Sequence, residues 1–176
     1  MLALIFDTET TGLPLHPEAK IELQPHIIEW GGVLVDGEKL IEEYHTLINP
    51  GEPIPPVVTK INGITDAMVK SEKSFRVVAD DLRPLFQRAD ALIAHNLPFD
   101  SSLMRFELQR AHQLTDWPWP RQLICTVQEH VPIFGRRPRL LELYEYYMGH
   151  PLEQTHRALD DVNALWEICL KAGILT

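Results

Sequence analysis

Apolar residues open the chain without a polar break from Leu2 to Phe6, a pattern typical of a strand that is buried on both faces. A second apolar run over 26–36 ends at Asp36-Gly37, and this pair predicts a hairpin turn into another strand over 40–48. Two shorter apolar runs predict further strands, at 91–94 and 123–127. The pattern therefore indicates five strands, of which the second and third pair antiparallel.

Apolar residues at helical spacing predict helices between and after these strands. The predicted helices span 75 to about 86, 97–112, 139–148 and 156 to about 172, with short helical turns over 57–69. We expect Ser74, Asn96 and Thr155 to act as N-caps, and Pro84 to kink or break the first helix. This order predicts an α/β layer fold, a mixed sheet with helices on its faces, in one domain over residues 1–176.

Composition and charge limit the function. Of the residues, 45% are hydrophobic and 23% charged, as in an ordinary folded domain. The net charge of −9 argues against a protein that coats nucleic acid with a basic surface, although bound divalent cations would reverse the local field of an acidic nuclease site. Cys125 and Cys169 lack metal-ligand spacing, and the first apolar run is too short for a signal peptide or membrane span. We therefore expect a soluble, cytoplasmic protein with reduced core cysteines and no membrane partner.

Two acids follow the first strand directly. Asp7 and Glu9 are two residues apart, so on an extended chain their side chains share one face, roughly 7 Å apart along the strand. Carboxylates that lose water and repel each other persist only when a cation lies between them or one is protonated. A turn with a solvated Glu9 explains this stretch equally well, so the rest of the chain has to decide.

Two further acids lie on apolar helix faces. At about 100° per residue, Asp161 falls inside the apolar arc of the last helix, whereas Asp160 falls on its polar side. Asp100 lies within the apolar face of the helix at 97–112, in a first turn where the helix dipole favours an acid. A buried acid needs a partner, which for Asp161 is either a metal ion or an arginine. Glu107 shares the face of Asp100, and the pattern gives it no role.

These acids form a set of four carboxylates at strand ends and helix starts: Asp7, Glu9, Asp100 and Asp161. An all-oxygen set suits Mg²⁺ or Mn²⁺ better than zinc, and several carboxylates can hold two ions about 4 Å apart for phosphoryl transfer. His156, close to Asp161 in sequence, is the candidate proton acceptor. A structural role is the commoner one for a lone histidine, but the other histidines have no such context.

Three segments resemble, in order and spacing, the motifs of the DEDDh 3′–5′ exonuclease family: Phe6-Asp7-Thr8-Glu9-Thr10-Thr11-Gly12, His95-Asn96-x-x-Phe99-Asp100 and His156-x-Ala158-x-x-Asp161. This family includes the epsilon proofreading subunit of bacterial DNA polymerase III, and the resemblance covers residues 2 to about 170. It implies a ribonuclease H-like fold with a five-stranded mixed sheet flanked by helices. It also implies two divalent ions, Mg²⁺ or Mn²⁺, held by the positions of the four carboxylates.

The resemblance further implies roles around the ions. His156 would be the general base that deprotonates the attacking water, and the product would be a nucleoside 5′-monophosphate released from a 3′ end. The residues implied to contact the terminal nucleotide are Thr10, Thr11, Gly12 and His95. Many relatives have a histidine where this chain has Asn62 before Gly63-Ile64-Thr65, so we expect Asn62 to make a weaker nucleotide contact.

The rest of the chain says less about substrate and partners. Basic residues at Arg136, Arg137 and Arg139 fit either phosphate contacts or a solvated loop, and Trp117 and Trp119 are candidate base-stacking residues whose placement stays open. The chain ends with its last predicted helix, so we expect no C-terminal extension like the one by which the epsilon subunit holds its polymerase. A polymerase partner is left open.

We therefore predict a metal-dependent 3′–5′ exonuclease that acts on the 3′ ends of single-stranded DNA. An exoribonuclease of the same family is the alternative, because nothing in the sequence distinguishes the 2′-hydroxyl of RNA. A non-catalytic module that binds nucleic-acid ends is a third hypothesis. The intact set of four acids together with His156 disfavours it, since such a module need not keep them.

Overall fold

The computed structural model describes residues 1–16, 18–153 and 155–175. Within them, five strands form one mixed sheet in the order β3-β2-β1-β4-β5. β2 pairs antiparallel with both β1 and β3, whereas β4 runs parallel to β1 and β5 parallel to β4. The strands are β1 (Leu2–Thr10), β2 (Ile27–Asp36), β3 (Lys39–Leu47), β4 (Ala91–Ala94) and β5 (Gln122–Cys125). The opening strand is thus the central strand of the sheet, which agrees with its predicted burial on both faces.

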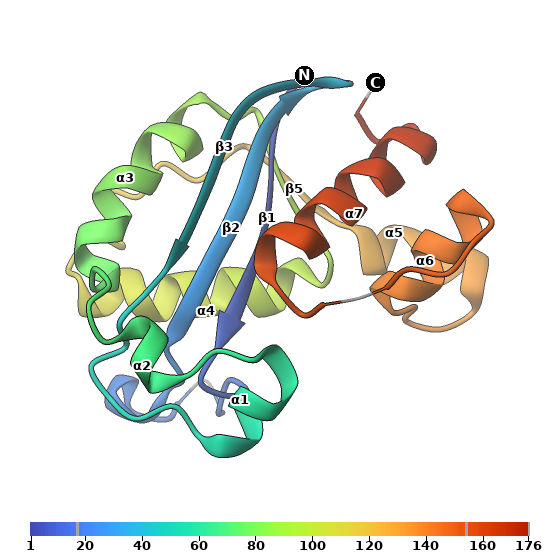
Figure 1. Ribbon diagram of the computed structural model, residues 1–176. Coiled ribbons are helices and arrows are strands. Elements are labelled where there is room, and N and C mark those ends of the chain that lie inside the picture. The colour runs from blue at the N-terminus through green and yellow to red at the C-terminus, as the bar shows by residue number, and fades with distance from the viewer. Residues whose placement is uncertain (17, 154, 176) are drawn as a thin grey trace.

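Helices cover both faces of this sheet (Figure 1). α3 (Phe75–Arg88) and α4 (Leu97–Arg110) pack on one face, and α6 (Leu140–Met148) and α7 (Ala158–Lys171) pack on the other. Shorter elements complete the chain: η1 (Ile21–Leu23), α1 (Pro56–Asn62), α2 (Asp66–Val69) and α5 (Thr126–Phe134). The predicted α/β layer fold and five-stranded mixed sheet are confirmed. None of the helices in the described residues is long and apolar enough to cross a membrane.

The alternation of side chains along β1 divides the core into two halves. Leu4 and Phe6 point toward α3 and α4, and the Phe6 ring stacks on Trp30 with ring centroids 5.9 Å apart. Ala3 and Ile5 point the other way, toward α6 and α7. Since the alternation continues, the next odd-numbered residues of β1 face the same side as α7.

The fifth strand is shorter than predicted. The apolar run 123–127 does not remain extended, because β5 ends at Cys125 and α5 begins at Thr126, a helix that the pattern did not predict. The reason lies in the neighbouring strand: β4 has four residues, and its last, Ala94, pairs with Cys125. Beyond that pair no backbone partner from β4 is available, and the chain turns into a helix. Cys125 is buried and free, as is Cys169, so the expectation of reduced core cysteines is confirmed.

Helix ends and the proline also differ from expectation. Ser74 and Asn96 occupy N-cap positions, but neither side chain makes a capping hydrogen bond. The prediction of a Thr155 cap is wrong: Arg157 is the N-cap residue of α7, and the Thr155 hydroxyl instead donates to Asp160 (2.7 Å). Of the kink or break expected at Pro84, the break does not occur, because α3 continues through this residue. Burial of the apolar residues on both sides of Pro84 outweighs the one helical hydrogen bond that proline cannot make.

Candidate active site

The end of β1 places two acids on the face that α7 covers. Asp7 lies opposite Gly31 and Glu9 opposite Glu29 in the antiparallel register with β2. Both residues are inside β1, which continues to Thr10. The alternative in which Asp7 opens a turn is therefore wrong, and the two carboxylates share one face as the strand geometry predicts.

α7 brings a third acid to this face. A Cβ on Gly31 would lie 2.8 Å from the backbone nitrogen of Leu159, so glycine lets the first turn of α7 approach β2 closely. Less than one turn further along, Asp161 is 8% exposed, whereas Asp160 is exposed to solvent. The predicted difference between these neighbouring acids is thus confirmed by their burial. Carboxylate oxygens of Asp7, Glu9 and Asp161 lie within 4.8 Å of one another.

Asp100 approaches from the other side of β1. β4 pairs only with Ala3, Leu4 and Ile5, so beyond Ile5 the β4 side of β1 lacks a strand partner. Asp100 of α4 takes this position: its Oδ1 accepts hydrogen bonds from the Thr8 amide (3.2 Å) and the Thr8 hydroxyl (2.8 Å). Its Oδ2 is buried with no hydrogen-bond partner among the described residues. One oxygen of Asp100 is therefore fixed to the strand, and the other is left for a further ligand.

The carboxyl groups of the site lie close enough that a negative charge on one opposes the ionisation of the others. Burial raises the pKa of Asp7 well above its usual value, and the charges of Asp100, Asp161 and Glu9 raise it further. Burial also raises the pKa of Glu9 to about 7, although a hydrogen bond from Asn62 opposes the rise. Burial likewise raises the pKa of Asp100, against hydrogen bonds from Thr8. A site with this many buried and half-buried acids needs either protons or cations to be stable.

The donor atoms fit a hard divalent cation. All of the grouped donors are carboxylate oxygens, and the buried Oδ2 of Asp100 has no other partner among the described residues. Mg²⁺ and Mn²⁺ prefer such oxygen donors, whereas structural zinc sites are rich in cysteine and histidine. Positive charge here would also remove the repulsion that raises the pKa values of these acids.

The loop after β1 is held by its own threonines. The Thr10 hydroxyl donates to the carbonyl of Gly12 (2.7 Å), and the Thr11 hydroxyl accepts from the His26 amide (2.9 Å). A Cβ on Gly12 would meet no described atom within 4 Å, and a cavity of about 320 Å³ is lined in part by Thr11, Gly12 and Leu13. Close by, the Asn62 amide donates to Glu9 (3.1 Å). Of the predicted substrate residues 10–12, Thr11 and Gly12 thus border an open space, and Asn62 contacts Glu9 of the acid cluster.

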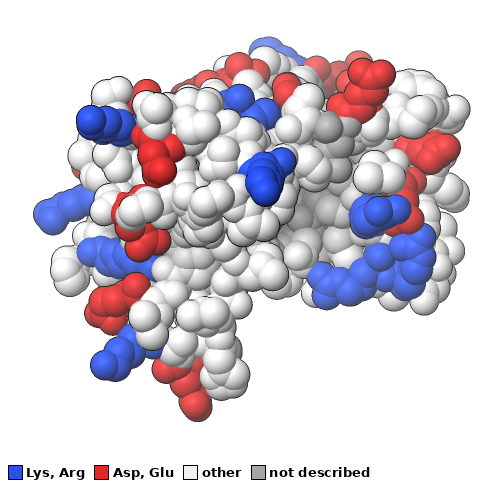
Figure 2. All heavy atoms as spheres, turned by 60° about the horizontal axis from the view of Figure 1, so that its bottom comes forward, with Lys and Arg blue, Asp and Glu red and all other residues white. Residues whose placement is uncertain are grey.

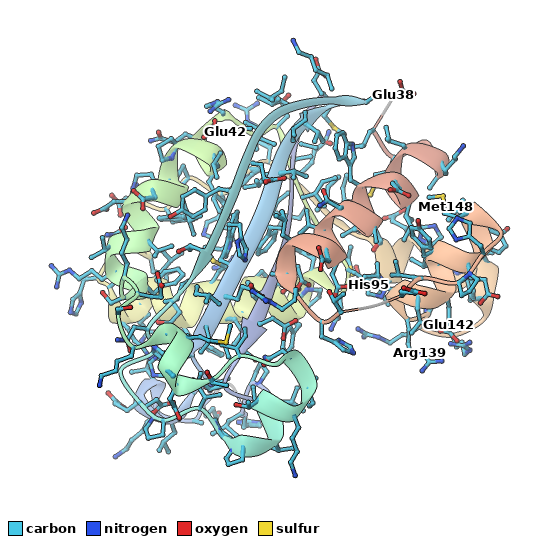
Figure 3. All side chains as sticks on the ribbon, in the orientation of Figure 1. Glu38, Glu42, His95, Arg139, Glu142 and Met148 are labelled. Atoms are coloured by element: carbon cyan, nitrogen blue, oxygen red, sulfur yellow. The ribbon has the colours of Figure 1, made fainter. Side chains whose placement is uncertain are left out.

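The two predicted histidines lie in different settings. His95 follows β4 and faces α5 (Figure 3), where its Nδ1 lies 3.1 Å from the Thr126 hydroxyl. Burial lowers the pKa of His95 to about 4, so the ring is neutral at physiological pH. His156 is exposed, two residues before α7, and its backbone adopts a left-handed conformation with φ of 53°. Their roles toward substrate stay predictions.

The basic loop, which carries Arg136, Arg137 and Arg139, adjoins the second of the three motifs, His95 to Asp100. Arg137 donates to the Asn96 side chain (2.5 Å), and Arg136 donates to Glu142 through both terminal nitrogens. Both arginines and Arg139 are exposed. Figure 2, which turns the end of β1 toward the viewer, shows basic side chains gathered beside a hollow in this surface.

Trp117 lies in the core, and Trp119 is partly buried against it. Trp117 is 5% exposed, and its ring lies against Phe86 with centroids 5.2 Å apart. Trp119 also packs against Phe86, and the Arg105 guanidinium lies over its ring, 4.8 Å from the centroid. The packing thus explains both tryptophans without a bound base.

Two buried acids have partners that sequence reasoning missed. Glu107 accepts a hydrogen bond from the Ile27 amide (3.0 Å) and forms an ion pair with Arg110 (3.2 Å), so it ties α4 to the start of β2. Glu29 is fully buried and pairs with Arg157 at the start of α7. The available signal for Glu29 was an acid inside the apolar run 27–35, since a buried charge requires a partner.

Fold and site together define an α/β protein whose carboxylate cluster suits the metal-dependent hydrolysis of phosphate esters. Comparison with known proteins agrees. Residues 4–169 match the RNase_T exonuclease family. The epsilon subunit of DNA polymerase III from Treponema pallidum is 33% identical over 166 residues, which cover 93% of this chain and 72% of that protein. The 3′-5′ exonuclease DinG of Bacillus subtilis is 32% identical over 172 residues, covering 96% of this chain but 17% of that protein.

Solved structures share the fold. Exonuclease X in complex with 5′ overhanging duplex DNA superposes with a TM-score of 0.65 at 24% identity, covering 96% of this chain and 89% of that one. The E. coli ExoI–ssDNA complex gives a TM-score of 0.78 at 18% identity, covering 98% of this chain and 40% of that one. The ribonuclease H-like fold expected from the motifs is confirmed.

The chain belongs to the RNase_T exonuclease family. The predictions of family membership and of a 3′–5′ exonuclease enzyme are therefore confirmed. Other relatives are much longer: the PolC-type DNA polymerase III of Thermotoga maritima is 29% identical over 175 residues, and this chain spans 12% of its length.

Proposed function

We propose that this chain removes nucleoside 5′-monophosphates from the 3′ ends of single-stranded DNA by two-metal-ion hydrolysis, with His156 as the general base. The same proposal assigns residues 1–176 to one exonuclease domain. The observation that carries it is the grouping of Asp7, Glu9 and Asp161, whose oxygens lie within 4.8 Å of one another. It is joined by the buried Oδ2 of Asp100, which has no hydrogen-bond partner in the part of the chain that the structure describes.

The four carboxylates and His156 have different roles in this reaction. Asp7, Glu9 and Asp161, together with Oδ2 of Asp100, would hold the two ions. When bound, these ions supply positive charge at the attacking and leaving oxygens of the phosphodiester. The imidazole of His156 accepts one proton from the water that attacks phosphorus. The bond between phosphorus and the 3′ oxygen of the preceding nucleotide breaks, and that oxygen takes up a proton from solvent, which leaves a 5′-monophosphate and a new 3′-hydroxyl end.

The substrate end would enter beside the loop at 10–12. The open space at Gly12 and the adjoining cavity of about 320 Å³ give room for a terminal nucleotide. The Thr10 and Thr11 side chains already hold the loop, so they would act through its shape. Asn62 would orient Glu9 as well as border the nucleotide, and His95, neutral at physiological pH, would approach it from the β4 side.

The DNA strand that leads to the 3′ end would pass the basic loop at Arg136, Arg137 and Arg139. Arg137 donates a hydrogen bond to Asn96, four residues before Asp100, so a phosphate contact at Arg137 would lie beside the segment that carries the second motif. Such contacts dominate the affinity of proteins for nucleic acid. The named function of the Treponema relative, a subunit of DNA polymerase III, makes a polymerase a reasonable partner to test by co-purification.

The direct test is hydrolysis of labelled oligonucleotides. Single-stranded DNA and RNA, each labelled at the 3′ or the 5′ end, are incubated with the protein and Mg²⁺, Mn²⁺ or EDTA. We expect the 3′ label to be released as a mononucleotide at once and the 5′ label to give a descending ladder, both only with metal. Faster degradation of RNA than of DNA would instead assign the chain to the exoribonucleases.

A matched pair of variants controls this assay. Asp161→Asn should lose activity by on the order of 100-fold or more, because it removes a metal-binding carboxylate. Asp160→Asn, one residue away on the exposed face, should retain most activity. Equal effects of the two substitutions, or degradation in EDTA, would contradict the proposed site.

A further inference from the structure

Glu29 lies beside the acid cluster but differs from it. It is 0% exposed on β2, directly opposite Glu9 in the register of the two strands. It therefore lies on the same face as Asp7 and Glu9, and position alone would make it a candidate metal ligand. Its hydrogen bonds give it a different role.

Both oxygens of Glu29 are occupied by other groups. The Arg157 Nε donates to Oε1 (2.9 Å) and Oε2 (3.1 Å), and Arg157 Nη2 also donates to Oε1. His45 Nε2 on β3 lies 2.7 Å from Oε1, and the Ala158 amide donates to Oε2 (3.1 Å). Although burial acts to raise the pKa of Glu29, hydrogen bonds from Arg157 and His45 hold it below its usual value. Glu29 is thus a paired anion, unlike its neighbour Glu9.

The partners of Glu29 mark the beginning of α7. Arg157 is the N-cap residue, Ala158 is the first residue of the helix, and the Asp161 amide donates to the carbonyl of Arg157 (3.1 Å). His156 immediately precedes Arg157. Glu29 therefore connects the central sheet to the short segment that carries both His156 and Asp161.

Gly31 reinforces this connection. It lies two residues from Glu29 on the same face of β2, and a Cβ there would be 2.9 Å from the backbone carbonyl carbon of Ala158. The first turn of α7 is thus held by contact at Gly31 and by charge at Glu29. His156, the residue just before Arg157, adopts the left-handed conformation, which non-glycine residues keep only when their surroundings hold it.

We propose that Glu29, acting through Arg157 and the Ala158 amide, is a positioning residue that sets the location of His156 relative to the carboxylates of β1. This inference rests on the proposed function, in which His156 accepts the proton of the attacking water. A displacement of about 1 Å at a catalytic group can cost on the order of 100-fold in rate. The Glu29–Arg157 pair therefore affects turnover through the position of His156, without touching the substrate.

The test combines Glu29→Gln with His156→Ala. Glutamine keeps the shape of Glu29 but removes the charge that orients Arg157, so we expect kcat to fall on the order of 100-fold with KM changed by less than about threefold. In the His156→Ala background the same substitution should cost less than about fivefold, because the positioned group is already absent. A purely structural role would give the same loss in both backgrounds.

A matched control is available on the same sheet. Glu42 of β3 pairs with Arg88 on the surface, and Figure 3 shows it at the far end of the sheet from His95. Glu42→Gln removes an exposed Glu–Arg pair from the same sheet and should leave kcat unchanged. If Glu29→Gln does not fold, Arg157→Lys serves in its place: lysine keeps the charge but not the two-nitrogen geometry, and kcat should fall about tenfold.

The outcomes separate the inference from the proposed function. If the wild type produces the metal-dependent ladder and Glu29→Gln retains its kcat, the positioning role is overturned and the exonuclease assignment stands. An equal loss in the wild-type and His156→Ala backgrounds would also overturn it. A wild type that degrades neither polymer would overturn the proposed function itself, and the inference with it.

Discussion

Replacing Glu9 with glutamine tests whether the site is built for positive charge. Burial raises the pKa of Glu9 from its ordinary 4.5 to about 7. Each pKa unit corresponds to about 1.4 kcal/mol, so ionised Glu9 costs the folded, metal-free protein up to ~3 kcal/mol. Glutamine keeps the oxygen that accepts the Asn62 amide but carries no charge. After allowance for the partial exposure of Glu9, we expect Glu9→Gln to stabilise the metal-free protein above pH 7 by about 1–3 kcal/mol.

The gain should depend on pH in one direction. Because the folded state binds the Glu9 proton more tightly than the unfolded chain does, the stability of the wild type falls as pH rises from 4.5 to 7. Below this window Glu9 is protonated in both states, and wild type and variant should be equally stable. Saturating Mg²⁺ or Mn²⁺ should reverse their order above the window, since metal binding stabilises the wild type and the variant lacks a ligand.

Urea unfolding followed by circular dichroism measures this difference. Free energies of unfolding are compared for wild type and Glu9→Gln on both sides of the pH window, in EDTA and in Mg²⁺. Glu42→Gln, which removes an exposed acid from the same sheet, is the control and should show no such gain. A metal-free Glu9→Gln protein that is less stable than wild type above pH 7 would refute the reasoning, as would a gain that Mg²⁺ leaves unchanged.

Three further predictions concern catalysis and binding. His156→Ala should lose on the order of 100-fold in kcat while calorimetric titration shows unchanged Mn²⁺ binding; full activity would remove His156 from the mechanism. Gly12→Ala should keep the wild-type melting temperature, because its Cβ meets no described atom within 4 Å, but raise KM about tenfold; an unchanged KM would exclude Gly12 from the nucleotide pocket. In an inactive Asp161→Asn background, Arg137→Ala should reduce the salt dependence of single-stranded DNA binding, measured by fluorescence anisotropy, by about one phosphate contact; an identical salt slope would show that Arg137 meets no phosphate.

Local patterns in the sequence determined most of the fold and much of the candidate site. The unbroken apolar run at Leu2–Phe6 identified the central strand, and Asp36-Gly37 located the hairpin. Helical periodicity separated buried Asp161 from exposed Asp160. These features follow from the period of a strand or a helix, which each segment carries in its own residues.

Other features depended on distant segments and could not be predicted. The length of β4 decided where β5 ends, since a strand stops where its partner stops. The open edge of β1 beyond Ile5 decided that one oxygen of Asp100 binds Thr8 while the other stays unpartnered among the described residues.

The start of α7 was decided in the same way. Sequence alone favoured a Thr155 cap, but the contact of Gly31 with the first turn and the Glu29–Arg157 pair hold the helix from Ala158 onward. The sequence therefore predicted which acids and which histidine form the candidate site. Only the tertiary structure decided which acids are grouped, which is paired with arginine and what holds them, because these properties arise from contacts between segments far apart in the chain.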